Sequence, residues 1–255
     1  MTGESGVDLY WLPLGAGGHS VRLNGRAFEA VAARLERRPA CDLYHSALEV
    51  RVPEGRFVIE QAPVRDDRGE ERGVVAVGAV GSRWAGRLRL FRYEVRRWQG
   101  GVIPDLDDAV GGPQRLTRDP DAAQRVLERA AELPTPVWGR DELQAGEMWN
   151  SNSVTAWLLV RSGVDIHSIQ VPAGGRAPGW HAGVVVARRQ ARLEASQMRG
   201  HLTIRHELSS EPPSRMARTA ARPGARSQKK REEEEERATG LEPVTSSLEG
   251  WRSTN

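Results

Sequence analysis

The sequence predicts an α+β fold, with an antiparallel sheet of about five strands and about three helices. Two patterns support this prediction. Short apolar runs bounded by glycine, proline or polar residues alternate along the chain with segments in which apolar side chains recur every three or four positions. Two of the runs, 42–52 and 56–64, flank Pro53-Glu54-Gly55, which is the pattern of an antiparallel hairpin.

The expected strands are short runs of apolar residues, many of them β-branched. Besides the two hairpin strands, they are 9–14, 73–81, 87–95 and 182–189, with a further short candidate at 201–208. In 87–95 arginine alternates imperfectly with leucine and phenylalanine, so we expect an edge or half-exposed strand there. A turn over 53–56 would pair Val50 with Ile59 and Val52 with Phe57, which puts the apolar residues of the hairpin on one face.

The expected helices begin at residues that cap helices well. Asn24 precedes a segment in which Phe28, Val31 and Leu35 recur at helical spacing before Pro39. Asp119-Pro120 places a cap and a proline before the helical segment 121–133. A third helix begins near Asn150 and ends at Gly163.

Composition divides the 255 residues into two parts. We expect a single globular domain over 1–190 and a disordered tail over 191–255, where apolar periodicity fades and five glutamates follow one another at 232–236. The last residues, 237–255, have a second interpretation as antisense translation of a transfer-RNA gene, that is, a gene-boundary artefact. We therefore assign no chemistry to the tail.

Several classes of function are excluded or disfavoured. The one cysteine, Cys41, rules out an intramolecular disulfide and a zinc site built from several cysteines. The six histidines do not have metal-binding spacing, and the glycines of 15–20 lack a phosphate-loop motif, so we expect no metal and no cofactor. No apolar stretch of membrane-spanning length occurs. With no signal-peptide pattern, we expect a cytoplasmic protein. A net charge of +3 makes nucleic acid an unfavoured partner, although arginines 83, 87, 89, 92, 96 and 97 form a local basic strip.

The segment 148–159 carries the strongest functional signal. Asn150 is a good helix cap, and Val154, Trp157 and Leu158 then fall on one helix face. Ser151 would lie in the first turn, where backbone N–H groups point outward and the helix dipole favours negative charge. Such a position suits a nucleophile, because the same N–H groups can stabilise an oxyanion.

Residues 150–164 (NSNSVTAWLLVRSGV) resemble the nucleophile helix of permuted NlpC-type papain-like proteins, which include the lecithin:retinol acyltransferase-like domains. Residues 44–50 (YHSALEV) resemble the histidine strand that precedes this helix in the family. Residues 57–60 resemble the strand that follows the histidine strand and carries the third polar residue. The resemblance covers about residues 8–165. It implies a papain-like fold with Ser151 as nucleophile, His45 as general base and then acid, Glu60 as third polar residue, and Asn150 and Asn152 near the oxyanion.

The sequence departs from the family in one respect, because serine stands where the family has cysteine. A serine hydroxyl needs a well-placed base, whereas a cysteine thiolate forms near neutral pH. Glu60 is also displaced: the expected hairpin register puts it roughly 13 Å along the ladder from His45. Glu60 could orient His45 only if a bulge shifts the register; otherwise a backbone carbonyl must do so.

Two functions therefore remain open. One is hydrolysis of, or acyl transfer from, an amide, ester or thioester of a small-molecule, peptide or lipid substrate. The other is the same fold without catalysis, acting as a binding or interaction module. Each site residue also has a structural explanation, in which His45 is a buried strand histidine, Asn150 and Ser151 are helix caps, and Glu60 is a sheet-edge charge.

Overall fold

The computed structural model describes residues 4–14, 29–30, 33–34, 37–64, 72–103 and 105–209. The chain divides into two units, Met1–Arg205 and His206–Asn255, and the second is described only as far as Ser209. The glycine-rich segment 15–20, the expected helix cap Asn24 and the tail from residue 210 lie outside the described residues. None of the helices in the described part of the chain is long and apolar enough to cross a membrane.

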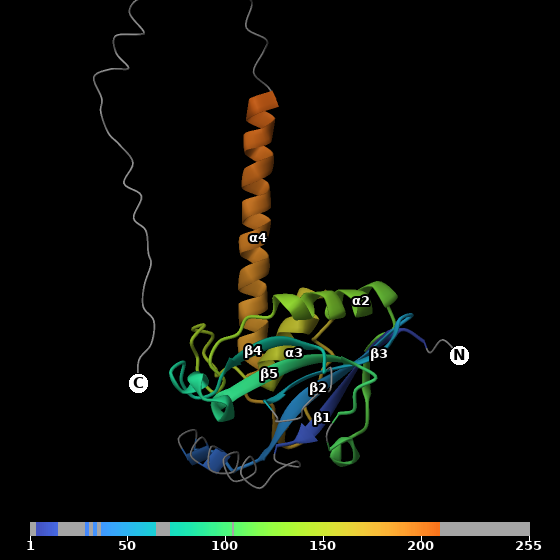
Figure 1. Cartoon of the computed structure of the whole chain (residues 1–255), viewed down its shortest axis with the longest axis vertical. Coiled ribbons are helices and arrows are strands. Elements are labelled where there is room, and N and C mark those ends of the chain that lie inside the picture. The colour runs from blue at the N-terminus through green and yellow to red at the C-terminus, as the bar shows by residue number, and fades with distance from the viewer. Residues whose placement is uncertain are drawn as a thin grey trace, which may run out of the picture. The chain divides into compact units, whose positions relative to one another are not determined.

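The architecture is α+β, as the sequence predicts, and its centre is a mainly antiparallel sheet (Figure 1). Across the sheet the strands run in the order β4 (Val74–Ala79), β5 (Arg92–Gln99), β3 (Gly55–Pro63), β2 (Asp42–Val52), β1 (Gly6–Pro13) and β6 (Gln114–Thr117). A two-residue strand, β7 (Gly175–Arg176), pairs in parallel with the start of β2.

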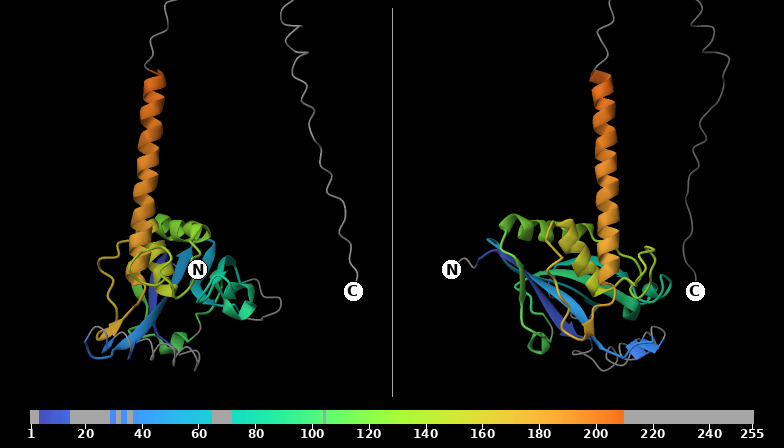
Figure 2. Two further views of the ribbon diagram at one scale, coloured as in Figure 1. Left: turned by 90° about the vertical axis from the view of Figure 1, so that its left-hand side faces the viewer. Right: turned by 180° about the vertical axis from the view of Figure 1, so that it is seen from behind.

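Three α-helices follow the strands in sequence: α2 (Pro120–Arg129), α3 (Ser151–Arg161) and α4 (Trp180–Ser209). Figure 2 shows α2 and α3 lying together on one side of the sheet, where both contact β2. Short 3₁₀ turns complete the described part, namely η1 (Ala85–Arg87), η2 (Arg89–Phe91), η3 (Leu106–Asp108) and η4 (Ala130–Glu132). Two of the three expected caps are present, since Asp119 precedes α2 and Asn150 precedes α3.

Strand alternation gives the sheet two different faces. The face toward α2 and α3 is apolar: Leu9, Leu48, Val50, Ile59 and Val95 pack there with residues of both helices. The opposite face carries a small apolar cluster of Tyr10, Leu12, Ala47, Val58 and Ile103, and most of the charged side chains of the sheet.

The hairpin of β2 and β3 forms as expected, but its register differs by two residues. Val50 pairs with Phe57 and Val52 with Gly55, rather than Val50 with Ile59 and Val52 with Phe57. Pairing starts at Gly55 because its backbone has φ of +140°, a conformation that favours glycine. A shift of two residues leaves every side chain on its expected face, since the side-chain period of a strand is two.

Three strand predictions are wrong. In the predicted strand 87–95, Arg87 ends η1, Leu88 follows it and 89–91 form η2, so the observed strand β5 begins only at Arg92. Residues 182–189 and 201–208 both belong to α4. The run Val184-Val185-Val186 suggested a strand, but Gly183 lets α4 pack closely on α3, where a β-carbon would meet the Ser153 carbonyl oxygen at 2.2 Å. This tertiary contact outweighs the β-propensity of three valines.

Helix α4 also crosses the domain boundary expected at residue 190.

Candidate functional site

The start of α3 is built from four consecutive polar residues, Asn150 to Ser153. The Asn150 side chain accepts hydrogen bonds from the backbone N–H groups of Asn152 (3.0 Å) and Ser153 (3.3 Å). The Ser153 hydroxyl in turn accepts from the Asn150 N–H at 3.1 Å, which completes a reciprocal capping box. The same hydroxyl donates to the Gly179 carbonyl oxygen at 2.7 Å. Two of the four residues therefore have structural roles.

Asn152 joins the helix to the sheet and to the loop before α4. Its amide group donates to the carbonyl oxygens of Tyr44 (2.9 Å) and Pro178 (2.9 Å), and its Oδ1 accepts from the Ser46 hydroxyl at 2.9 Å. With 2 % of its surface exposed, it is a buried polar residue whose groups are all engaged. Asn152 is thus a connector between distant segments rather than an exposed oxyanion donor.

The position of Asn152 follows from the pairing of β2. Described pairing of β2 with β3 ends at Leu48 and Ile59, whereas β2 continues to pair with β1 as far as Tyr44. The Leu43 carbonyl oxygen accepts from Leu14 on the β1 side, so the next carbonyl along the strand, that of Tyr44, points away from β1. Asn152 supplies the donor that a neighbouring strand would otherwise provide.

Ser151 is the first residue of α3 and is buried, with 6 % of its surface exposed. Among the described residues, its hydroxyl has no hydrogen-bond partner. Ser151 is therefore the one member of the Asn150–Ser153 segment whose side chain the local structure does not use.

His45 lies on the face of the sheet opposite to α3. It pairs across the ladder with Leu12, which belongs to the apolar cluster of the outer face. Its neighbour Ser46 points the other way and contacts Asn152. The structure therefore does not bring the His45 ring and the Ser151 hydroxyl together on one face, as a nucleophile and its base require. Burial lowers the pKa of His45 to about 4, and the Asp105 carboxylate opposes this shift.

Glu60 shares the outer face with His45, but its described partner is an arginine. Glu60 Oε1 accepts from Arg96 at 3.1 Å, and Arg96 Nε also donates to Glu94 at 2.6 Å. All three side chains are buried, and Arg72 lies 3.4 Å from Glu94. Glu60 is thus part of a buried ion-pair cluster that stabilises the outer face.

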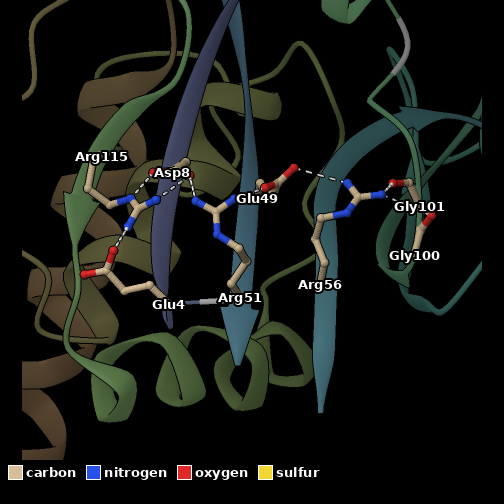
Figure 3. Close-up of polar contacts among 8 residues, drawn as sticks. All are labelled: Glu4, Asp8, Glu49, Arg51, Arg56, Gly100, Gly101 and Arg115. Carbon is tan, nitrogen blue, oxygen red and sulfur yellow. Dashed lines mark hydrogen bonds and ion pairs between the residues drawn. The ribbon is translucent and has the colours of Figure 1, made fainter. Parts of the chain in front are cut away.

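A second charged network crosses β6, β1, β2 and β3 on the same face (Figure 3). The carboxylate of Asp8, which is 2 % exposed, binds both Arg115 and Arg51, and Arg51 also binds Glu49. Arg56 continues the chain, with 3.1 Å to Glu49 and 2.7 Å to the Gly101 carbonyl oxygen. Opposite charges are paired throughout, so we interpret this network as structural.

The arginine strip expected along 83–97 does not form one surface. Arg96 is buried, and Arg97 donates to the Leu127 carbonyl oxygen at 3.0 Å. Arg92 donates to the carbonyl oxygens of Gly86 (2.5 Å) and Arg87 (3.3 Å). These three guanidinium groups, half of the six in the expected strip, bind other parts of the fold. They are therefore not available to contact a nucleic-acid phosphate backbone.

In the described part of the chain, no group of three or more His, Cys, Asp or Glu side chains is placed so that it could hold a metal ion. Cys41 is partly buried beside Glu29, whose carboxylate accepts from the Cys41 N–H at 2.9 Å. Burial, aided by a hydrogen bond to Glu29, raises the pKa of the Cys41 thiol, so this environment does not favour a thiolate.

Sequence reasoning missed the residues that hold the Asn150–Ser153 segment in place. Ser46, Tyr44 and the Pro178-Gly179 loop are its main partners, and the first two lie more than a hundred residues away along the chain. No local pattern could have indicated these contacts. In comparison with known proteins, neither a family model nor a curated protein nor a solved structure matches the chain.

Proposed function

We propose that the chain is a non-catalytic binding module with a permuted papain-like fold. One observation carries the proposal: His45 and Ser151 occupy opposite faces of the sheet. General-base catalysis needs the base within about 2.6–3.2 Å of the hydroxyl it deprotonates. Strand alternation turns His45 to the outer face, away from α3 and Ser151, which disfavours that contact, and the capping and connecting roles of Asn150, Asn152 and Ser153 explain the rest of the motif without chemistry.

The resemblance of 44–50 and 150–164 to the papain-like family supports the fold assignment in this proposal. The order of the two segments is that of the permuted family, and the helix begins at the cap the resemblance implies. We further propose a cytoplasmic location, which suits a chain with one cysteine and no disulfide requirement.

A second candidate is a serine-type hydrolase or acyltransferase acting on an amide, ester or thioester. It is favoured by the Ser151 hydroxyl, which has no partner in the described structure and lies at the N-terminus of an eleven-residue helix. Catalysis would require a base other than His45 to reach Ser151.

Labelling with a fluorophosphonate probe separates the two candidates. We expect no labelling of the native protein above the level of a Ser151→Ala variant, because an unactivated serine hydroxyl reacts poorly. Ser168→Ala, at an exposed serine, is the matched control. Labelling that is lost in Ser151→Ala but kept in Ser168→Ala would contradict the module. A His45→Ala variant would then show whether His45 is the base.

A further inference from the structure

The segment Trp84–Phe91 exposes an unusual number of large apolar side chains. Leu90 is 83 % exposed, Trp84 71 %, Leu88 56 % and Phe91 41 %. Single exposed apolar residues are ordinary on a soluble protein, but four within eight consecutive residues indicate a binding surface. The segment contains the 3₁₀ turns η1 and η2. Because a 3₁₀ turn rises only about 2 Å per residue, the exposed side chains lie closer together than they would on an extended strand.

The segment is held in place rather than loosely attached. The Arg92 guanidinium donates to two of its carbonyl oxygens, those of Gly86 and Arg87. At its start, Arg83 forms two hydrogen bonds to Glu142 (2.8 and 3.1 Å), and Gly81 N–H donates to the Trp138 carbonyl oxygen at 3.0 Å. The fold therefore presents these apolar side chains to solvent in an ordered backbone, which lowers the entropic cost of binding.

The charged side chains within the segment itself all have one sign. Arg87 and Arg89 are exposed and alternate with Leu88 and Leu90, and no Asp or Glu occurs between Arg72 and Tyr93. Apolar and aromatic side chains interleaved with arginines suit the interface of an anionic membrane, where Trp and Leu enter the headgroup and acyl boundary and Arg meets lipid phosphate. A stable protein interface uses about 20–30 residues a side, which is far more than this segment offers.

We propose that the surface formed by Trp84–Phe91 docks the protein on an anionic lipid membrane. The inference deepens the proposed function by naming the partner of the binding module. It involves none of the residues of the Asn150–Ser153 segment, so the fluorophosphonate experiment and the lipid experiment can fail independently.

The test is sedimentation of the full chain with vesicles of phosphatidylcholine, alone or with about one third phosphatidylserine. We expect binding to the vesicles that contain phosphatidylserine. The triple variant Trp84→Ser/Leu88→Ser/Leu90→Ser should lose about tenfold or more in partitioning, because it removes the side chains that enter the bilayer. Arg87→Ala should lose about fivefold on anionic vesicles and change nothing on neutral ones.

The matched control is Val102→Ser/Leu193→Ser/Met198→Ser, which removes three equally exposed apolar side chains elsewhere and should bind like the native chain. Leu90→Ser alone is a milder variant, and unchanged thermal unfolding of each variant shows that it is folded. Absence of binding to anionic vesicles overturns the proposal, as does equal binding by the triple variant and the native chain. Equal binding to neutral vesicles, or binding to nucleic acid without binding to vesicles, also overturns it.

Discussion

The two faces of the sheet are buried by different means. On the face toward the helices, residues such as Leu48, Val50 and Ile59 pack against α2 and α3, and burial of apolar area supplies the stabilisation. On the outer face, Asp8, Glu94 and Arg96 are as deeply buried as the core, yet they are charged. Each of them is compensated by a partner of opposite charge on the same or a neighbouring strand.

The difference teaches where function can lie in this protein. The helix face ends in an uncharged polar region at the start of α3, whereas the predicted site residues His45 and Glu60 lie on the outer face. A catalytic arrangement would need groups from both faces. A binding function needs neither, and its candidate surface, Trp84–Phe91, belongs to the segment between β4 and β5 at the edge of the sheet.

The largest effect should come from breaking the buried ion-pair cluster of the outer face. In Arg96→Leu, the carboxylates of Glu60 and Glu94 lose the arginine they share, so we expect a loss of about 3–5 kcal/mol in the free energy of unfolding. Urea denaturation measures this loss. The control is Arg83→Leu, which removes an exposed pair with Glu142 and should lower the free energy of unfolding far less, because exposed ion pairs contribute little. Similar losses in the two variants would show that the outer face is not stabilised by buried pairing.

An intermediate effect is expected on the helix face at Asn152. The change Asn152→Leu keeps a similar volume but leaves the Tyr44 carbonyl oxygen and the Ser46 hydroxyl without their donor and acceptor. We expect a loss of about 2–3 kcal/mol in the free energy of unfolding, because buried polar groups without partners are costly. Replacing the cap, Asn150→Ala, should cost about 1 kcal/mol. If Asn152→Leu unfolds at the denaturant concentration of the native chain, Asn152 does not connect helix and sheet.

The smallest effect concerns His45 and pH. Its pKa falls from 6.5 to about 4 on folding, mainly through burial, so the unfolded chain binds the proton more tightly. The stability that this group contributes is complete above pH 6.5 and is lost as the pH falls from 6.5 toward 4. Because part of the His45 surface remains exposed, solvent screening limits the loss to about 1–2 kcal/mol.

The His45→Gln variant should lack this part of the pH dependence. The unfolding free energy of the native chain minus that of the variant should therefore decrease as the pH is lowered from 7 to 4. The control is His167→Gln at an exposed histidine, which should follow the native profile. Parallel profiles for the native chain and His45→Gln would mean that the His45 ring is not buried on the outer face.

Much of the fold could be predicted from local patterns. The strands at 9–14, 42–52, 56–64 and 73–81 and the helices after Asp119 and Asn150 appear where the sequence indicates, because alternation and capping residues act over a few positions. The hairpin register was wrong by two residues, since it depends on where pairing starts at Gly55. Helix α4 was missed because its first turns are decided by contact with α3 rather than by propensity.

The candidate site was less predictable than the fold. The helix cap at Asn150 and the first-turn position of Ser151 follow from the sequence, and the structure has both. The relation of His45 to Ser151 does not, because one residue of strand alternation decides which face a side chain takes. The ion-pair partner of Glu60 is Arg96 of β5, and no local pattern predicts that β5 pairs with β3.

The sequence by itself determined the α+β class, the hairpin, the two caps and the polar start of α3, since these depend on interactions between residues close together along the chain. Only the tertiary structure decided that Asn152 connects α3 to β2, that Arg96 compensates Glu60 and Glu94, and that His45 and Ser151 lie on opposite faces. Those outcomes depend on which strands are neighbours and on which face the helices cover. Contacts between distant segments set both, through the burial of apolar area and the pairing of buried charge.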